Sequence, residues 1–116
     1  MSDRPAIQVS LERHPSGAVV VTAQGDISYH EAPEYRSVLR KAFDLRPTRV
    51  VADLAGVPYM ATPGLATLVE ALQISKKSGT PLVLCGLSDR VRAIFEIARL
   101  HTVFRIVEGL EQAMEP

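Results

Sequence analysis

The stretch from Val50 to Leu72, VVADLAGVPYMATPGLATLVEAL, decides the fold. It begins with a nearly continuous apolar run, which is typical of a central strand that is covered on both faces. It continues as a helix whose apolar residues recur at i, i+3, i+4 and i+7, namely Leu65, Leu68, Val69 and Leu72. A buried strand that runs directly into an amphipathic helix predicts an α/β domain.

The segment before this stretch predicts a β-hairpin. Residues 7–13, IQVSLER, alternate apolar and polar side chains, which indicates a half-buried strand. HPSG at 14–17 supplies turn residues, and AVVVTAQG at 18–25 follows as a more apolar strand. A doubly wound fold normally starts strand–helix–strand, so an opening hairpin indicates a different α/β topology.

The other elements alternate helices with strands. A first helix is expected near Ala32, because Pro33 then falls in its first turn, and this helix should end before the Arg-Pro pair at 46–47. Later come a buried strand in TPLVLCGL (80–87), a helix capped by Ser88 in SDRVRAIFEIARL (88–100), a short strand in VFRIV (103–107) and a helical turn in LEQAM (110–114). We expect one domain over 1–116, with its core at about 7–107. Its sheet should be mixed and mostly parallel, with four to five strands, an opening β-hairpin and helices packed on it.

The composition excludes several classes of protein. With 116 residues, 47% of them hydrophobic, the chain is long enough for one core and too short for two. The 13 basic and 13 acidic residues balance, which leaves no electrostatic footprint for nucleic acid or an anionic membrane. No apolar run reaches the length of a membrane span, the start lacks a signal-peptide core, and a lone Cys85 fits a reducing compartment. We therefore expect a soluble, cytoplasmic protein.

The sequence contains no evident catalytic, cofactor or metal site. Neither of the common glycine-rich phosphate loops is present. His14, His30 and His101 are scattered without metal-ligand spacing, and Cys85 lies in an apolar run where a small buried side chain is expected. We therefore expect a protein that is not an enzyme and has no cofactor.

Two aspartates follow predicted strands, at the edge where α/β folds place their sites. Asp53 in VVADLAGV resembles the phosphate acceptor of a receiver domain, and such a domain would need Mg²⁺. However, the segment CGLSDR lacks the lysine of receiver domains. The opening hairpin does not fit their topology either. The structural alternative is that Asp53 binds nearby backbone amides. Asp26 follows the second predicted strand.

Thr62 has two interpretations. It is a good helix N-cap, and Pro63 would then occupy the first helical position, where its missing N–H costs nothing. A hydroxyl at an exposed helix start is also well placed for phosphorylation, because the helix dipole and free amides favour an added anion. Both interpretations stay open at this point.

A second face of the same helix also has two interpretations. It carries small or apolar side chains with one charge, Glu70, nearby: Pro63, Thr67, Ala71 and Ile74. A smooth face of this kind suits the docking of another protein. It would equally suit packing under a neighbouring helix of the same domain.

Together these segments resemble the STAS domain family, of the anti-sigma factor antagonist type. The resemblance rests on the opening hairpin, the G-D-I-S segment, an Ala-Pro-Glu helix, the stretch from Val50 to Leu72, and the segment GLSDRVRAIF. It covers roughly residues 7–107. Its most specific part is the helix start, where the family reads D-S-S/T-G-L and this chain reads Ala61-Thr62-Pro63-Gly64-Leu65.

This resemblance implies a bacterial regulator of transcription that works by partner switching. Family members of this type bind an anti-sigma factor that is also a serine/threonine kinase, phosphorylation abolishes the capture, and a phosphatase restores it. The resemblance makes Thr62 the phosphate acceptor. It implies a partner-binding surface made of Asp26, Ser28, Met60, Ala61, Pro63, Gly64, Thr67, Glu70, Ala71 and Ile74.

The chain departs from the family pattern beside the acceptor. Ala61 replaces the motif aspartate, Pro63 replaces the second hydroxyl residue, and Ser28 replaces a common acidic residue. These departures favour an alternative, in which the domain is a phosphorylation-independent docking subunit, for example of a lipid-transport ABC complex. No nucleic-acid binding or membrane insertion is expected, and an exposed apolar helix face would also allow a homodimer.

Overall fold

The computed structural model describes residues 7–115 and contains one mixed sheet of five strands in the order β1-β2-β3-β4-β5. The strands are β1 (Gln8–Arg13), β2 (Ala18–Gln24), β3 (Arg49–Gly56), β4 (Leu82–Cys85) and β5 (Arg105–Val107). β1 and β2 form an antiparallel hairpin, and all other neighbours are parallel. The mixed, mostly parallel sheet with an opening hairpin is therefore confirmed.

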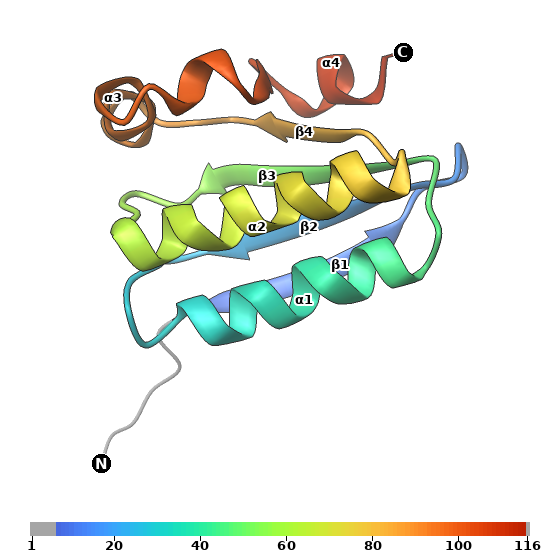
Figure 1. Ribbon diagram of the computed structural model, residues 1–116, viewed down its shortest axis with the longest axis horizontal. Coiled ribbons are helices and arrows are strands. Elements are labelled where there is room, and N and C mark those ends of the chain that lie inside the picture. Colours follow the sequence, from blue (N-terminus) through green and yellow to red (C-terminus); the bar gives the residue numbers. More distant parts are fainter. Residues whose placement is uncertain (1–6, 116) are drawn as a thin grey trace.

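The helices follow the predicted order. They are α1 (Ala32–Asp44), α2 (Thr62–Ser78), α3 (Asp89–Ile97), the 3₁₀ turn η1 (Leu100–Thr102) and α4 (Leu110–Met114). α1 and α2 lie side by side across one face of the sheet (Figure 1). The helix α1 begins at Ala32 with Pro33 in its first turn, as expected. Ser88 caps α3 by accepting a hydrogen bond from the Val91 amide.

The main core fills the space between the sheet and the helices α1, α2 and α3. Apolar side chains from one face of β2, β3 and β4 meet the buried stripes of these helices. The alternation of β1 continues this arrangement, because Gln8, Ser10 and Glu12 are exposed whereas Val9 and Leu11 pack against the core. The opposite face of the sheet carries a second, smaller apolar cluster, which α4 covers.

The C-terminal end of α2 is clearly marked. Its last residue is followed by Gly79, which adopts a left-handed backbone with φ of 78° and donates its amide to the Ser75 carbonyl. Lys76 and Lys77 lie in the last turn, where basic side chains favour the negative end of the helix dipole. The N-terminus of α2 lies at the carboxyl end of β3, beside the loop that leaves β2.

Candidate functional site

Backbone hydrogen bonds join the β2–α1 loop to the β3–α2 loop. Ile27 forms an isolated parallel bridge with Met60, donates its amide to the Tyr59 carbonyl at 3.1 Å, and accepts a hydrogen bond from the Ala61 amide at 2.9 Å. Asp26 and Ser28 flank Ile27 in sequence, so this bridge brings them to the start of α2. The structure thus brings together two segments of the predicted surface that lie over 30 residues apart in the chain.

Thr62 is the first residue of α2 and not its N-cap. Ala61 occupies the N-cap with extended backbone (φ −88°, ψ 174°), and its carbonyl accepts hydrogen bonds from the Gly64 and Leu65 amides. The predicted cap at Thr62 is therefore wrong, and so is the predicted first position for Pro63, which lies one residue deeper. The helix starts one residue earlier than predicted because the Ala61 carbonyl already accepts the first helical hydrogen bonds. The hydrogen bond from the Ala61 amide to the Ile27 carbonyl holds Ala61 in this position.

The hydroxyl of Thr62 therefore has no capping role. The Thr62 side chain is exposed, and its oxygen has no hydrogen-bond partner among residues 7–115. Pro63 lacks an amide proton and the Gly64 amide is bonded to Ala61, so few free N–H groups remain in this first turn. An exposed hydroxyl without a structural task is available for modification.

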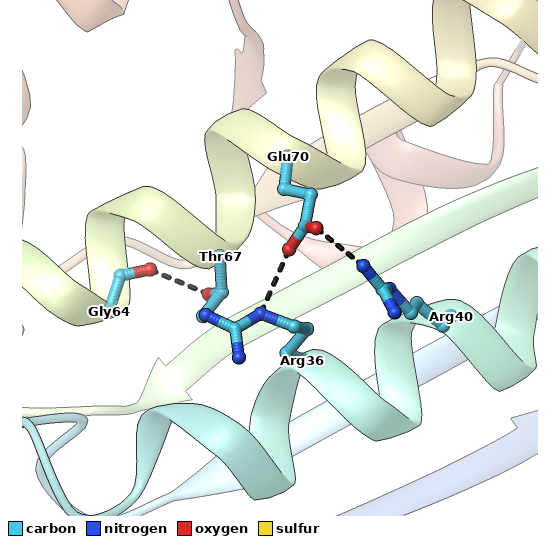
Figure 2. Close-up of polar contacts among 5 residues, drawn as sticks. All are labelled: Arg36, Arg40, Gly64, Thr67 and Glu70. Carbon is cyan, nitrogen blue, oxygen red and sulfur yellow. Dashed lines mark hydrogen bonds and ion pairs between the residues drawn. The ribbon is translucent and has the colours of Figure 1, made fainter.

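The face of α2 that carries Thr67 and Ala71 is buried within the domain. Thr67 is 1% exposed and Ala71 is 2% exposed, and the Thr67 hydroxyl donates to the Gly64 carbonyl at 2.6 Å. Figure 2 shows Thr67 on the side of α2 that is turned toward α1. Met60 and Gly64 are buried as well. The prediction that these four residues dock a partner is therefore wrong, because their small side chains and the Met60 side chain pack inside the domain instead.

Glu70 is bound by two arginines of α1. Arg36 Nε donates to one carboxylate oxygen at 2.9 Å and Arg40 Nη2 donates to the other at 2.6 Å (Figure 2). The hydrogen bond from Arg40, with the charges of both arginines, lowers the pKa of Glu70 below its usual value. Because the three side chains remain partly exposed, these ion pairs link α1 to α2 at modest energetic gain. Ile74, the last member of the predicted surface, is half-buried against the core.

A hollow of about 330 Å³ lies between the starts of α1 and α2. Its lining residues are Tyr29, His30, Ala32, Pro33, Arg36 and Pro63. Tyr29 is 73% exposed, and its ring meets the His30 ring edge-on with 5.4 Å between centroids. Sequence reasoning missed Tyr29, His30 and Arg36, because only the packing of α1 against α2 brings them to Pro63.

On the other side of the helix start, the Arg90 guanidinium lies over the Tyr59 ring at 4.8 Å from its centroid. This cation–π contact joins the start of α3 to the β3–α2 loop. Around the start of α2, the predicted surface that remains accessible consists of Asp26, Ser28, Ala61, Thr62 and Pro63, and Glu70 and Ile74 are partly exposed farther along the helix.

The other candidate residues occupy structural positions. Asp53 lies in β3 and its Oδ1 accepts a hydrogen bond from the Ala55 amide at 3.1 Å, as the structural alternative predicted. Cys85 is buried, and burial, assisted by the charge of Asp53, raises the pKa of its thiol to about 11. Within residues 7–115, no three potential metal-ligating side chains come together. The helices of this described part are also too short or too polar to cross a bilayer.

Comparison with known proteins identifies the family. Residues 8–113 match the STAS domain family. The anti-sigma-B factor antagonist of Listeria monocytogenes is 30% identical over 106 residues, which cover 89% of this chain and 92% of the relative. The crystal structure of an anti-sigma factor antagonist from Mycobacterium paratuberculosis has a TM-score of 0.87 at 23% identity, covering 98% of this chain and 96% of that one.

A further solved structure shares the fold. SpoIIAA of Bacillus, in its phosphorylated form, has a TM-score of 0.71 at 17% identity and covers 90% of this chain and 94% of its own. STAS anti-sigma factor antagonists are binding proteins and not enzymes. The sequence match runs from the first strand into α4, and the fold agrees over nearly the full chain. The protein therefore belongs to the STAS domain family, and within it to the anti-sigma factor antagonists.

Proposed function

We propose that this protein captures an anti-sigma factor that is also a serine/threonine kinase, and that phosphorylation of Thr62 releases this partner. The observation that carries the proposal is the exposed Thr62 hydroxyl, which neither caps α2 nor binds another described group. The relatives named as anti-sigma factor antagonists support the class of partner. The phosphorylated form of SpoIIAA supports regulation by phosphate on this fold.

The surroundings of Thr62 indicate how a phosphate would act. A phosphate adds nearly two negative charges at pH 7. Because Pro63 and the bonded Gly64 amide leave few N–H groups to neutralise it, most of this charge would face the solvent or a docked protein. Desolvating an unpaired dianion in an interface is costly, so the modified protein would lose its partner. The domain itself would keep its fold.

The hollow beside Pro63 supports a contact surface around Thr62. Tyrosine is over-represented among residues that dominate binding energy, and Tyr29 projects from the rim of this hollow next to the helix start. We infer that the partner contacts Tyr29 together with Asp26, Ser28, Ala61 and Pro63. A Tyr29→Ala variant should then weaken capture at least about tenfold without changing the stability of the free protein.

A second function is favoured by one observation. Ala61 and Pro63 remove a carboxylate and an amide from the turn that holds the acceptor hydroxyl. A phosphorylation-independent docking subunit, such as one in a lipid-transport complex, needs neither group. In that case the same surface binds a partner constitutively.

The test uses a purified candidate partner, an anti-sigma factor of the serine/threonine-kinase type. The protein is incubated with this kinase, Mg²⁺ and ATP, and its intact mass is measured. One added phosphate is expected on the native chain and on a Thr102→Ala control, which removes an exposed threonine of η1, and none on Thr62→Val. Thr62→Glu should weaken binding at least about tenfold, because it imitates part of the added charge.

The two functions give different results in this experiment. Tight binding with no added phosphate on the native chain would reject the switch and favour the docking subunit. Phosphate on Thr62→Val would reject Thr62 as the acceptor. We further propose that a phosphatase resets the switch and that the protein acts in the cytoplasm. Homodimer formation stays a prediction, which size-exclusion chromatography with light scattering would check.

A further inference from the structure

The back face of the sheet is covered by one very short helix. Opposite α1 and α2, an apolar cluster of Val20, Val51, Val83 and Cys85 is at most 7% exposed, and Ala113 of α4 completes it. α4 has only five residues, of which Ala113 is fully buried and Met114 is partly buried. The burial of this whole face therefore depends on α4 remaining in place.

An arginine from the sheet holds α4 there. Arg49, the first residue of β3, donates from Nη1 to the Ala113 carbonyl at 2.9 Å and also to the Glu115 carbonyl. Arg105 adds only a longer hydrogen bond of 3.3 Å to the same Glu115 carbonyl. These carbonyls end the helix, so a cation here also favours the negative end of the helix dipole. The bond of Arg49 to Ala113 links the most deeply buried residue of α4 to the start of β3, the central strand.

Arg49 makes these bonds at a cost. Its Nε is buried and has no hydrogen-bond partner among residues 7–115. A buried donor without a hydrogen-bond partner has lost its bonds to water without replacement, which is unfavourable. Attachment of α4 is therefore weaker than the number of its hydrogen bonds indicates.

An isolated helix of five residues does not form in water, because nucleation is unfavourable and too few residues follow it. Once detached, α4 would therefore unfold at once. The rest of the domain does not need it, because the main core lies on the opposite face and holds β2, β3 and β4 by itself. Segments of this kind open locally at a much smaller free energy than global unfolding.

We propose that α4 is a clasp fastened by Arg49, which opens without unfolding of the domain and transiently exposes the apolar back face of the sheet. This opening is a property of the fold and does not rest on the proposed function at Thr62. The thiol of Cys85, the single cysteine of the chain, lies beneath the clasp and reports its opening. Reaction requires the thiolate, which the closed form hardly contains because burial raises the thiol pKa to about 11.

The experiment measures the rate at which an aromatic disulfide reagent, 5,5′-dithiobis(2-nitrobenzoate), labels Cys85 in the full chain. In the native protein, labelling at low urea should be nearly independent of urea concentration, because local opening exposes little surface. Arg49→Ala should raise this rate at least about tenfold. Arg105→Ala should raise it less, and Arg13→Ala on β1 should leave it unchanged.

A second variant decides the outcome if Arg49→Ala fails to fold. Ala113→Asp places a charge in the back-face cluster without altering the sheet, so it should also speed labelling while the far-ultraviolet circular dichroism stays native-like. The clasp is rejected if labelling of the native protein follows the full urea dependence of global unfolding. It is also rejected if neither variant labels faster than the native chain.

Discussion

Gly64 packs so closely on Ile27 that a β-carbon at position 64 would lie 2.8 Å from the Ile27 carbonyl oxygen. The same oxygen accepts the amide hydrogen bond of Ala61 that sets the start of α2. A side chain at this position would also meet Met60 Cγ at 2.7 Å. The glycine therefore allows the turn that presents Thr62.

We expect Gly64→Ala to destabilise the protein by about 1–3 kcal/mol, because the backbone of Ile27 cannot give way to a new methyl group. Urea unfolding followed by circular dichroism measures the loss. Replacing glycine by alanine within a helix normally stabilises by about 0.5–1 kcal/mol, so the sign of the effect is informative. The control is Ala66→Gly at an exposed position of the same helix, which should cost about that smaller amount. A more stable Gly64→Ala protein would contradict the close contact.

Loss of a hydroxyl should affect stability at the start of α3 but hardly at the start of α2. Thr62→Ala should change the free energy of unfolding by less than about 0.5 kcal/mol, since its hydroxyl caps nothing. Ser88→Ala should cost about 1 kcal/mol, because Ser88 accepts the Val91 amide at 3.2 Å. Urea unfolding of both variants under one set of conditions gives the comparison. Equal losses would mean that Thr62 caps α2 in solution.

Most of the fold could be predicted from the sequence, because the spacing of apolar residues and the capping residues indicate the strands and helices locally. The alternation of residues 7–13, the apolar run from Val50 and the serine cap of α3 each depend on neighbours in the chain. The predicted N-cap of α2, Thr62, lies one residue after the observed N-cap, Ala61, because a hydroxyl residue is preferred at a cap but not required there. Here the backbone bond from Ala61 to Ile27 sets the helix start instead.

The candidate site could be predicted only in part. Thr62, Asp26 and Ser28 are accessible at one end of the sheet, as a surface site requires. The burial of Thr67 and Ala71 could not be predicted, because a smooth helix face is equally suited to a partner protein and to a helix of the same domain. This face of α2 is buried because α1 packs against it, and α1 lies over 20 residues away in the chain.

The ion pairs of Glu70 predict a specific dependence of stability on pH. Hydrogen bonding by Arg40 lowers the pKa of Glu70 in the folded state, so the unfolded chain binds this proton first as the pH falls. The contribution of Glu70 to the free energy of unfolding is therefore present above its ordinary pKa of about 4.5. It is lost as the pH falls through the lowered pKa of the folded state. Glu70→Gln should cost less than about 1 kcal/mol at pH 7, because all three side chains are partly exposed.

The measurement is urea unfolding of the native protein and Glu70→Gln between pH 7 and pH 3, roughly the range in which carboxylates titrate. The difference between the two should shrink as the pH falls. A difference that stays constant over this range would show that the glutamine disturbs packing and that the ion pairs contribute nothing. Added salt at neutral pH should also reduce the difference, since exposed charges are screened.

Tyr35 of α1 carries a hydroxyl that its surroundings do not satisfy. The side chain is 0% exposed, and the hydroxyl has no hydrogen-bond partner among residues 7–115. Burial, with the nearby charge of Asp53, raises the pKa of this group above its ordinary value of 10.0. Tyr35→Phe removes the unsatisfied group and keeps the packed ring, so the free energy of unfolding should stay equal or rise by up to about 1 kcal/mol.

A second measurement separates this effect from a change in packing. Because the folded state keeps the Tyr35 proton that the unfolded chain releases above its ordinary pKa of 10.0, the native protein should lose stability as the pH rises beyond that value. Tyr35→Phe should lack this part of the loss, whereas Tyr59→Phe, at a half-buried ring, should keep it. Urea unfolding from pH 8 to about pH 11 tests both variants, since tyrosine titrates near the upper end of this range. A Tyr35→Phe protein less stable than the native one by more than about 1 kcal/mol would mean that the hydroxyl is hydrogen-bonded in solution.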